Sequence, residues 1–193
     1  MKRLVLKFGG TSVANLERIA HVAEIVAARR AETRAIAVVV SAMSGTTNQL
    51  VEWTRGAAGP DLHGVDYDDE YDVVVASGEQ VTAGLLALAL RRKGLKARSW
   101  LGWQLKLSTD EAHGKARITG CDNPEFIRSV DSGEIAVVAG FQGVDENGRV
   151  STLGRGGSDT SAVAVAAAIG ADRCDIYTDV DGVYTTDPRI VAK

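Results

Sequence analysis

The stretch Gly154-Arg155-Gly156-Gly157-Ser158-Asp159 (GRGGSD) runs directly into the alanine-rich segment Thr160–Ile169. Glycines followed by Ser-Asp are typical of a flexible loop that opens a helix. The N-terminus of a helix attracts anions, and the guanidinium of Arg155 is a planar fork for a carboxylate or a phosphate. We therefore expect this loop to bind a small, negatively charged ligand.

Outward from this loop, apolar runs of strand length alternate with helical patterns. Strands are expected at 3–8, 35–40, 135–139 and 174–178, helices at 15–30, 50–54, 70–92, 124–130 and 160–169, and a hairpin at 141–153. The long tract at 70–92 is expected to be interrupted at Ser77-Gly78-Glu79, which would expose backbone and a carboxylate. The segment Lys96–Leu107 is expected to form two strands joined by a turn. This alternation predicts an α/β fold, a three-layer α/β/α sandwich with a mostly parallel central sheet, in which ligands bind at the carboxyl ends of the strands.

Composition limits the classes of protein that fit. With 193 residues, 45% hydrophobic and 24% charged, the chain has the size and mixture of a single soluble domain. Its formal net charge of −3 argues against a nucleic-acid partner and against an anionic membrane surface. Cys121 and Cys174 are isolated in sequence, so we expect free thiols and assign no metal ligands. Met1 precedes a strand-like segment and no apolar run approaches a membrane span, so a cytoplasmic protein is expected.

Lys7 is unusual because it lies inside an apolar strand and is followed by Phe8, Gly9 and Gly10. A lysine at a strand end is commonly a surface residue whose stem packs on apolar neighbours. At the carboxyl end of a central strand, beside flexible glycines, it is also suited to neutralise a phosphoryl group in transfer. The P-loop pattern GxxxxGK[ST] does not occur in the sequence, so a P-loop protein is excluded.

Several segments together resemble the catalytic domain of aspartokinases, which belong to the amino-acid kinase family. They are Lys7–Val13 (KFGGTSV), Ser41–Asn48 (SAMSGTTN), Ser77–Glu79 (SGE), Gly154–Thr160 (GRGGSDT) and Tyr177–Arg189 (YTDVDGVYTTDPR). The resemblance implies an amino-acid kinase domain, carbamate kinase-like in fold, over residues 1–193. It also implies transfer of the ATP γ-phosphoryl group to the side chain of L-aspartate, giving 4-phospho-L-aspartate, with Mg²⁺ bridging the phosphates. That reaction opens lysine, threonine and methionine biosynthesis.

The same resemblance implies roles for individual residues. The catalytic residues would be Lys7, which contacts the transferring phosphoryl group, and Asp159, which orients Lys7. The implied substrate-binding residues are Thr47, Glu79, Arg155, Gly156, Gly157 and Ser158. The implied ATP-binding residues are Lys7, Phe8, Gly9, Gly10, Thr178, Asp179, Tyr184 and Arg189. From sequence alone, Asp159 equally suits a plain helix N-cap, and 179–187 an ordinary turn.

Opposite charges on Glu79 and Arg155 would suit the ammonium and α-carboxylate of an amino acid. Aspartokinase kinase domains continue past the position of Lys193 and carry a second lysine, and regulatory ACT domains normally follow. We therefore expect a domain truncated on the nucleotide side and without an ACT domain, in a homo-oligomer or associated with a chain that supplies the missing part. Two alternatives remain open: a related kinase that acts on another acid, and a non-catalytic binding module of the same fold.

Overall fold

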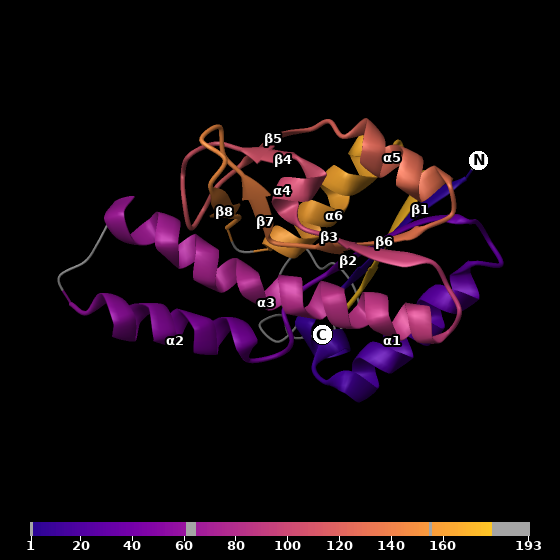
Figure 1. The fold of residues 1–193 in the computed structure, drawn as a ribbon, viewed down its shortest axis with the longest axis horizontal. Helices are drawn as coiled ribbons and strands as arrows, with labels where there is room; N and C mark the ends of the chain where they lie inside the picture. The colour runs from indigo at the N-terminus through magenta and orange to yellow at the C-terminus, as the bar shows by residue number, and fades with distance from the viewer. Residues whose placement is uncertain (1, 61–64, 155, 179–193) are drawn as a thin grey trace, which may run out of the picture.

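A parallel five-stranded sheet forms the centre of the protein (Figure 1). The computed structural model describes residues 2–60, 65–154 and 156–178. The strand order is β3-β6-β2-β1-β9, with β1 at Arg3–Phe8, β2 at Ala35–Val40, β3 at Ala97–Trp100, β6 at Ile135–Ala139 and β9 at Arg173–Tyr177. Every residue of β2 and β6 is buried, as expected of strands covered on both faces.

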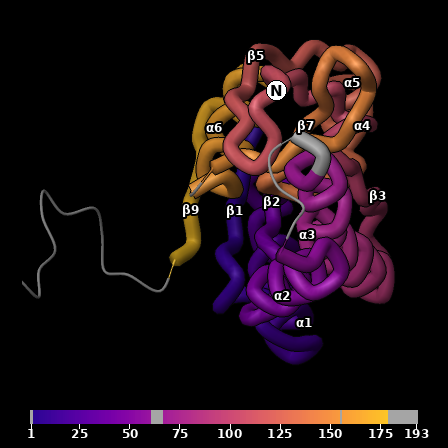
Figure 2. The backbone as a smooth tube through the Cα atoms, turned by 90° about the vertical axis from the view of Figure 1, so that its left-hand side faces the viewer, coloured from indigo at the N-terminus to yellow at the C-terminus, as the bar shows by residue number. Residues whose placement is uncertain are grey.

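Helices cover both faces of this sheet, so the predicted three-layer α/β/α sandwich is confirmed. The first layer holds α1 (Leu16–Arg29) and α3 (Val65–Arg92), with α2 (Thr46–Ala58) packed along α3. The second holds α5 (Pro124–Asp131) and α6 (Gly157–Ala168). Each layer closes its own apolar cluster against one face of the sheet. Figure 2 shows α1, α2 and α3 on one side of β1 and β2, with α6 on the other.

A second, four-stranded sheet was not predicted from the sequence. Its order is β5-β4-β7-β8, with β4 at Leu107–Thr109, β5 at Ile118–Cys121, β7 at Gln142–Val144 and β8 at Val150–Thr152. The predicted hairpin at 141–153 is confirmed as the antiparallel pair β7 and β8. Between β3 and β4 the chain forms a short helix, α4 (Gly102–Leu105), where we expected only a turn.

The expected interruption of the long helix is wrong, because α3 continues without a break from Val65 to Arg92. A Cβ atom on Gly78 would lie 2.9 Å from the Cβ of Ala42 and 3.3 Å from a methyl carbon of Leu50. This glycine therefore serves the close approach of α3 to its neighbours rather than a bend. Glu79 is correspondingly not exposed at a break but buried, with 3% of its surface accessible. Two other helices begin earlier than predicted, α2 at Thr46 and α6 at Gly157.

Helix α3 is also apolar and long enough to meet the length and hydropathy criteria of a membrane span over Tyr67–Arg92. Half of that apolar window is buried inside the protein. Asp72 and Glu79 lie within the helix and accept hydrogen bonds from backbone N–H groups of other segments. These features are those of the core helix of a folded domain.

Candidate active site

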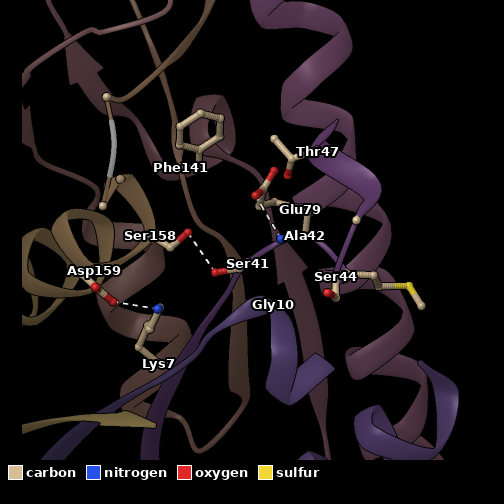
Figure 3. Close-up of a pocket in the computed structure, with 15 residues that line it drawn as sticks. Lys7, Gly10, Ser41, Ala42, Ser44, Thr47, Glu79, Phe141, Ser158 and Asp159 are labelled. Atoms are coloured by element: carbon tan, nitrogen blue, oxygen red, sulfur yellow. Dashed lines mark hydrogen bonds and ion pairs between the residues drawn. The ribbon is translucent and has the colours of Figure 1, made fainter. Parts of the chain in front are cut away.

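A cavity of about 380 Å³ lies at the carboxyl ends of β1 and β2 (Figure 3). Five parts of the chain contribute to it: the end of β1 with the turn after it, the turn and α2 that follow β2, the middle of α3, the segment between β6 and β7, and the loop into α6. The lining residues are Lys7, Gly10, Ser41, Ala42, Met43, Ser44, Gly45, Thr47, Glu79, Phe141, Gly154, Gly156, Gly157, Ser158 and Asp159. Four of the five segments quoted above therefore contribute residues to one cavity; they are Lys7–Val13, Ser41–Asn48, Ser77–Glu79 and Gly154–Thr160.

Lys7 supplies a positive charge on one wall of this cavity. In the sheet it stands opposite Val39 of β2 and Ile176 of β9, and only 10% of its side chain is exposed. Its Nζ lies 2.7 Å from Oδ1 of Asp159, whose side chain is 51% exposed. The contact is an ion pair without the alignment of a hydrogen bond to that oxygen. Asp159 thus holds the ammonium at the cavity while leaving its N–H groups able to turn toward a ligand.

The N-terminus of α6 forms the neighbouring wall. Gly156 occupies the N-cap position with a φ of 78°, a conformation that glycine adopts without strain. At Gly157 a Cβ atom would lie 2.6 Å from a ring carbon of Phe141 and 2.9 Å from the Cβ of Leu153, so a side chain does not fit there. The glycines thus bring the helix N-terminus, with its partial positive charge, against the cavity.

Glu79 supplies a carboxylate on the α3 side of the cavity. Its Oε1 accepts a hydrogen bond of 2.9 Å from the backbone N–H of Ala42, whereas Oε2 is buried and has no hydrogen-bond partner among the described residues. Burial raises the pKa of Glu79 to about 7, and the Ala42 N–H only partly offsets this effect. A buried oxygen without a partner is costly, so this position favours a ligand that brings a positive charge or a donor.

Two hydroxyl groups lie between Lys7 and Glu79. Ser41, the first residue after β2, donates a hydrogen bond of 3.0 Å from its Oγ to Oγ of Ser158 on α6. Because Ser158 accepts this bond, its own proton is available to an acceptor in the cavity. Thr47, in the first turn of α2, lines the opposite wall.

The structure brings together Lys7, Asp159, Gly10, Thr47, Glu79 and the described substrate residues of the loop, Gly156, Gly157 and Ser158. Two predicted ATP-binding residues, Phe8 and Gly9, do not line the cavity. The ring of Phe8 is buried in the core and stacks on Tyr177 with centroids 4.5 Å apart, so a ligand can meet only its backbone. Gly9 is not among the residues that line the cavity, although a Cβ there would lie 3.6 Å from Lys7 Nζ.

Thr178 follows β9 outside the cavity lining. The remaining predicted residues, Arg155, Asp179, Tyr184 and Arg189, lie outside the described residues.

Seven residues of the cavity lining were not among the predicted site residues, and they are Ser41, Ala42, Met43, Ser44, Gly45, Phe141 and Gly154. Two of them have side chains or a backbone conformation that bear on function. Ser41 stands in the quoted segment SAMSGTTN, directly after a buried strand, and that position was the available signal. Phe141 follows β6 and has a φ of 65°, which is uncommon for a residue with a side chain and often marks a functional site. No motif indicated this conformation.

The profile of the amino acid kinase family matches residues 2–193, so the chain belongs to that family. It is 54% identical over 193 residues to the aspartate kinase of Stutzerimonas stutzeri strain A1501, covering all of this chain and 46% of that protein. Among solved structures, it resembles aspartate kinase from Synechocystis, with 43% identity and a TM-score of 0.79 over 98% of this chain and 30% of that one.

The structure of E. coli aspartokinase III in complex with aspartate and ADP is also similar, with 28% identity and a TM-score of 0.81 over 98% of this chain and 52% of that one. The predicted resemblance to aspartokinases is thereby confirmed. The chain spans about half the length of the curated relatives that it matches.

Proposed function

We propose that the chain is the catalytic half of an aspartate kinase, which transfers the γ-phosphoryl group of ATP to the side-chain carboxylate of L-aspartate. The observation that carries the proposal is the pairing of opposite charges across one cavity. Lys7, held by Asp159, offers a cation for the phosphoryl group. Glu79 offers an ammonium a buried oxygen that has no hydrogen-bond partner within the described part of the chain. The relatives named above support the choice of aspartate.

The reaction needs positioning rather than proton abstraction. The side chain of free aspartate, with an ordinary pKa of about 3.9, is already ionised at neutral pH and can attack without a general base. One carboxylate oxygen forms a bond to the γ-phosphorus while the bond from that phosphorus to the β,γ-bridging oxygen breaks, leaving ADP. The ammonium of Lys7 and the N-terminus of α6 would stabilise the negative charge on the phosphoryl oxygens.

Substrate recognition would use both ends of the amino acid. Oε2 of Glu79 would accept a hydrogen bond from the substrate ammonium, and the hydroxyl of Ser158 would donate to a carboxylate, held in place by Ser41. Thr47 would contact the substrate from α2. Arg155 is proposed to bind the α-carboxylate as a planar fork, together with the backbone at Gly156 and Gly157.

For the nucleotide we propose Lys7, the backbone of Phe8, Gly9 and Gly10, and the segment that starts at Thr178 and includes Asp179, Tyr184 and Arg189. Mg²⁺ typically binds through substrate phosphates and one or two carboxylates, and when bound it neutralises phosphate charge. Among the described residues no group of three or more His, Cys, Asp and Glu side chains gathers that could hold a metal ion. The protein residue that would contact it is Asp159, half exposed beside Lys7.

The sequence-based predictions of a kinase domain over 1–193, a cytoplasmic location, and a homo-oligomer or association with a chain that supplies the missing part are kept as part of this proposal. A kinase for another acid and a non-catalytic module are the alternatives that the experiment must separate.

The test combines binding with turnover. Calorimetric titration of the 193-residue chain should show that aspartate binds more tightly than glutamate. Glu79→Gln should weaken the binding of both acids, because both carry the ammonium that Glu79 accepts. Acyl phosphate formed with ATP and trapped by hydroxylamine should require aspartate and be lost in Lys7→Ala. Lys96→Ala, an exposed lysine outside the cavity, is the control that should leave both readouts unchanged. Equal use of glutamate would overturn the aspartate assignment, and aspartate binding without any acyl phosphate would favour the non-catalytic module.

A further inference from the structure

Phe141, directly after β6, and Gln142, the first residue of β7, together contact both walls of the cavity. One wall is the N-terminus of α6 with Ser158, and the other is α3 with Glu79. In the view of Figure 3, Phe141 stands between these two side chains. Under the proposed function, carboxylate and phosphoryl oxygens meet the first wall and the ammonium meets the second. The distance between the walls therefore sets the length of the amino acid that fits.

Phe141 is attached to α6 through its backbone. Its N–H donates a hydrogen bond of 3.0 Å to Oγ of Ser161, and that hydroxyl donates one of 2.8 Å to the carbonyl of Gly157 in the first turn of the helix. Its carbonyl accepts a hydrogen bond of 2.9 Å from the N–H of Leu153. A φ of 65° is uncommon for phenylalanine and persists where the surroundings hold the residue firmly. Ser161 is fully buried, so this attachment is shielded from bulk water.

Gln142 continues the connection to α3. Its side chain is fully buried, and its Nε2 donates a hydrogen bond of 2.9 Å to the carbonyl of Ala76. Its Oε1 accepts a hydrogen bond of 3.3 Å from Nε2 of Gln80, one helical turn further along α3. Ala76 and Gln80 flank Glu79 in sequence, so Gln142 holds the turn of the helix that presents Glu79 to the cavity. Since a helical carbonyl already accepts a bond within its own helix, the bond from Gln142 is an additional restraint from outside α3.

Close packing leaves each wall little room to shift relative to the sheet. At Gly140, the residue after β6, a Cβ atom would lie 3.0 Å from the carbonyl oxygen of Val40 and 3.2 Å from the Cβ of Ser158. At Gly78 on α3, a Cβ atom would lie 2.9 Å from the Cβ of Ala42, just after β2. Both walls therefore pack directly against the segments that follow the central strands. The hydrogen bonds of Phe141 and Gln142 then join one wall to the other.

We propose that Gln142 and Ser161 are positioning residues that fix the distance between the walls and thereby select aspartate over glutamate. With Phe141 they form a bridge between α6 and α3, and neither of the two side chains lines the cavity itself. The inference rests on the proposed function, because it assumes that the ammonium binds at Glu79 and a carboxylate binds at α6. Glutamate is longer than aspartate by one methylene, and a pocket of fixed size discriminates such a pair by roughly 10- to 200-fold. A pocket whose walls can separate adjusts to the longer acid and loses that discrimination.

The test compares the affinities for aspartate and glutamate by calorimetric titration of the 193-residue chain. Gln142→Met keeps the length of the side chain and removes its hydrogen bonds, and Ser161→Ala removes one oxygen. Each variant should lower the ratio of aspartate affinity to glutamate affinity on the order of tenfold, with weaker binding of aspartate and stronger binding of glutamate. A loss of stability alone would weaken both acids alike and leave the ratio unchanged.

Ser151→Ala is the matched control. Ser151 is as buried as Ser161, and its Oγ shares a hydrogen bond of 2.7 Å with Oγ1 of Thr109 inside the second sheet, outside the cavity lining. The control should lose stability in urea unfolding as Ser161→Ala does, and it should keep the parent ratio. The full parent ratio in either bridge variant that circular dichroism shows to be folded, or an equal loss in Ser151→Ala, would overturn the bridge alone. Equal binding of both acids by the parent chain would overturn the aspartate assignment, and the bridge with it.

Discussion

Glu79 is a buried carboxyl group whose burial should make the stability of the protein depend on pH. The free energy of folding includes the cost of removing its charge from water, and the backbone N–H groups of Ala42 and of Glu79 itself offset only part of that cost. The Glu79→Gln substitution keeps the size and an acceptor oxygen for Ala42, and it removes the charge. The variant should therefore be more stable than the parent wherever the parent carries an ionised Glu79.

The magnitude follows from the pKa of Glu79, which is raised from an ordinary 4.5 to about 7. The folded protein holds the proton more tightly than the unfolded chain, so stability is full below pH 4.5 and falls as the pH rises toward 7. At about 1.4 kcal/mol for each pH unit, the loss reaches roughly 3 kcal/mol above pH 7. Glu79→Gln should recover a gain of this order at pH 8 and almost none at pH 4.5.

Urea unfolding of parent and variant at several pH values between 4.5 and 8 measures this difference directly. Glu52→Gln, at an exposed position of α2, is the matched control and should change stability little at any pH. If the advantage of Glu79→Gln were the same at pH 4.5 and pH 8, the reasoning from a desolvated charge would be refuted. Such a result would mean that water or another group satisfies Oε2 in the folded protein.

Three further predictions concern the cavity. Aspartate binding should strengthen about tenfold for each pH unit between 5 and 7 and then level off, because Glu79 must be ionised to meet the ammonium; calorimetry that finds the same slope in Glu79→Gln would contradict this. Gly157→Ala should lower stability by about 1–3 kcal/mol in urea unfolding, since its Cβ would meet Phe141, and a neutral effect would show that the ring can move. Asp159→Asn should lower kcat by about tenfold or more with a smaller change in KM for aspartate, because the substitution removes the ion pair that positions the Lys7 ammonium. A change in KM alone would place Asp159 in substrate binding.

The central sheet could be predicted because its strands carry their own signal. Runs such as Ala35–Val40 contain only apolar residues over the length of a strand, and no amphipathic helix has that pattern. Lys7 stood out for the same reason, as a charge inside such a run. The second sheet gave no comparable signal, since its strands have three or four residues and carry polar side chains such as Ser108 and Thr109. Pairing between distant segments, rather than local pattern, stabilises strands of that length.

Gly78 shows where local reasoning fails. A glycine beside a serine and a glutamate in a long helical pattern reads as a break, because glycine weakens helices. Its actual role depends on Ala42 and Leu50, which are distant in sequence and leave no room for a Cβ atom. Residue type alone does not distinguish a glycine that bends a helix from one that permits contact.

The same limit applies to the chemistry of the cavity, with a more specific consequence. Sequence reasoning could pair Glu79 with an ammonium by charge, but it took the carboxylate to be exposed at a break in the helix. An exposed carboxylate is hydrated and gains little from a ligand. A buried carboxylate with an oxygen that lacks a partner destabilises the folded protein until a cation binds. Binding of the substrate ammonium relieves part of that destabilisation and therefore gains affinity. The uninterrupted helix that corrected the fold prediction therefore also explains why Glu79 is suited to its proposed role.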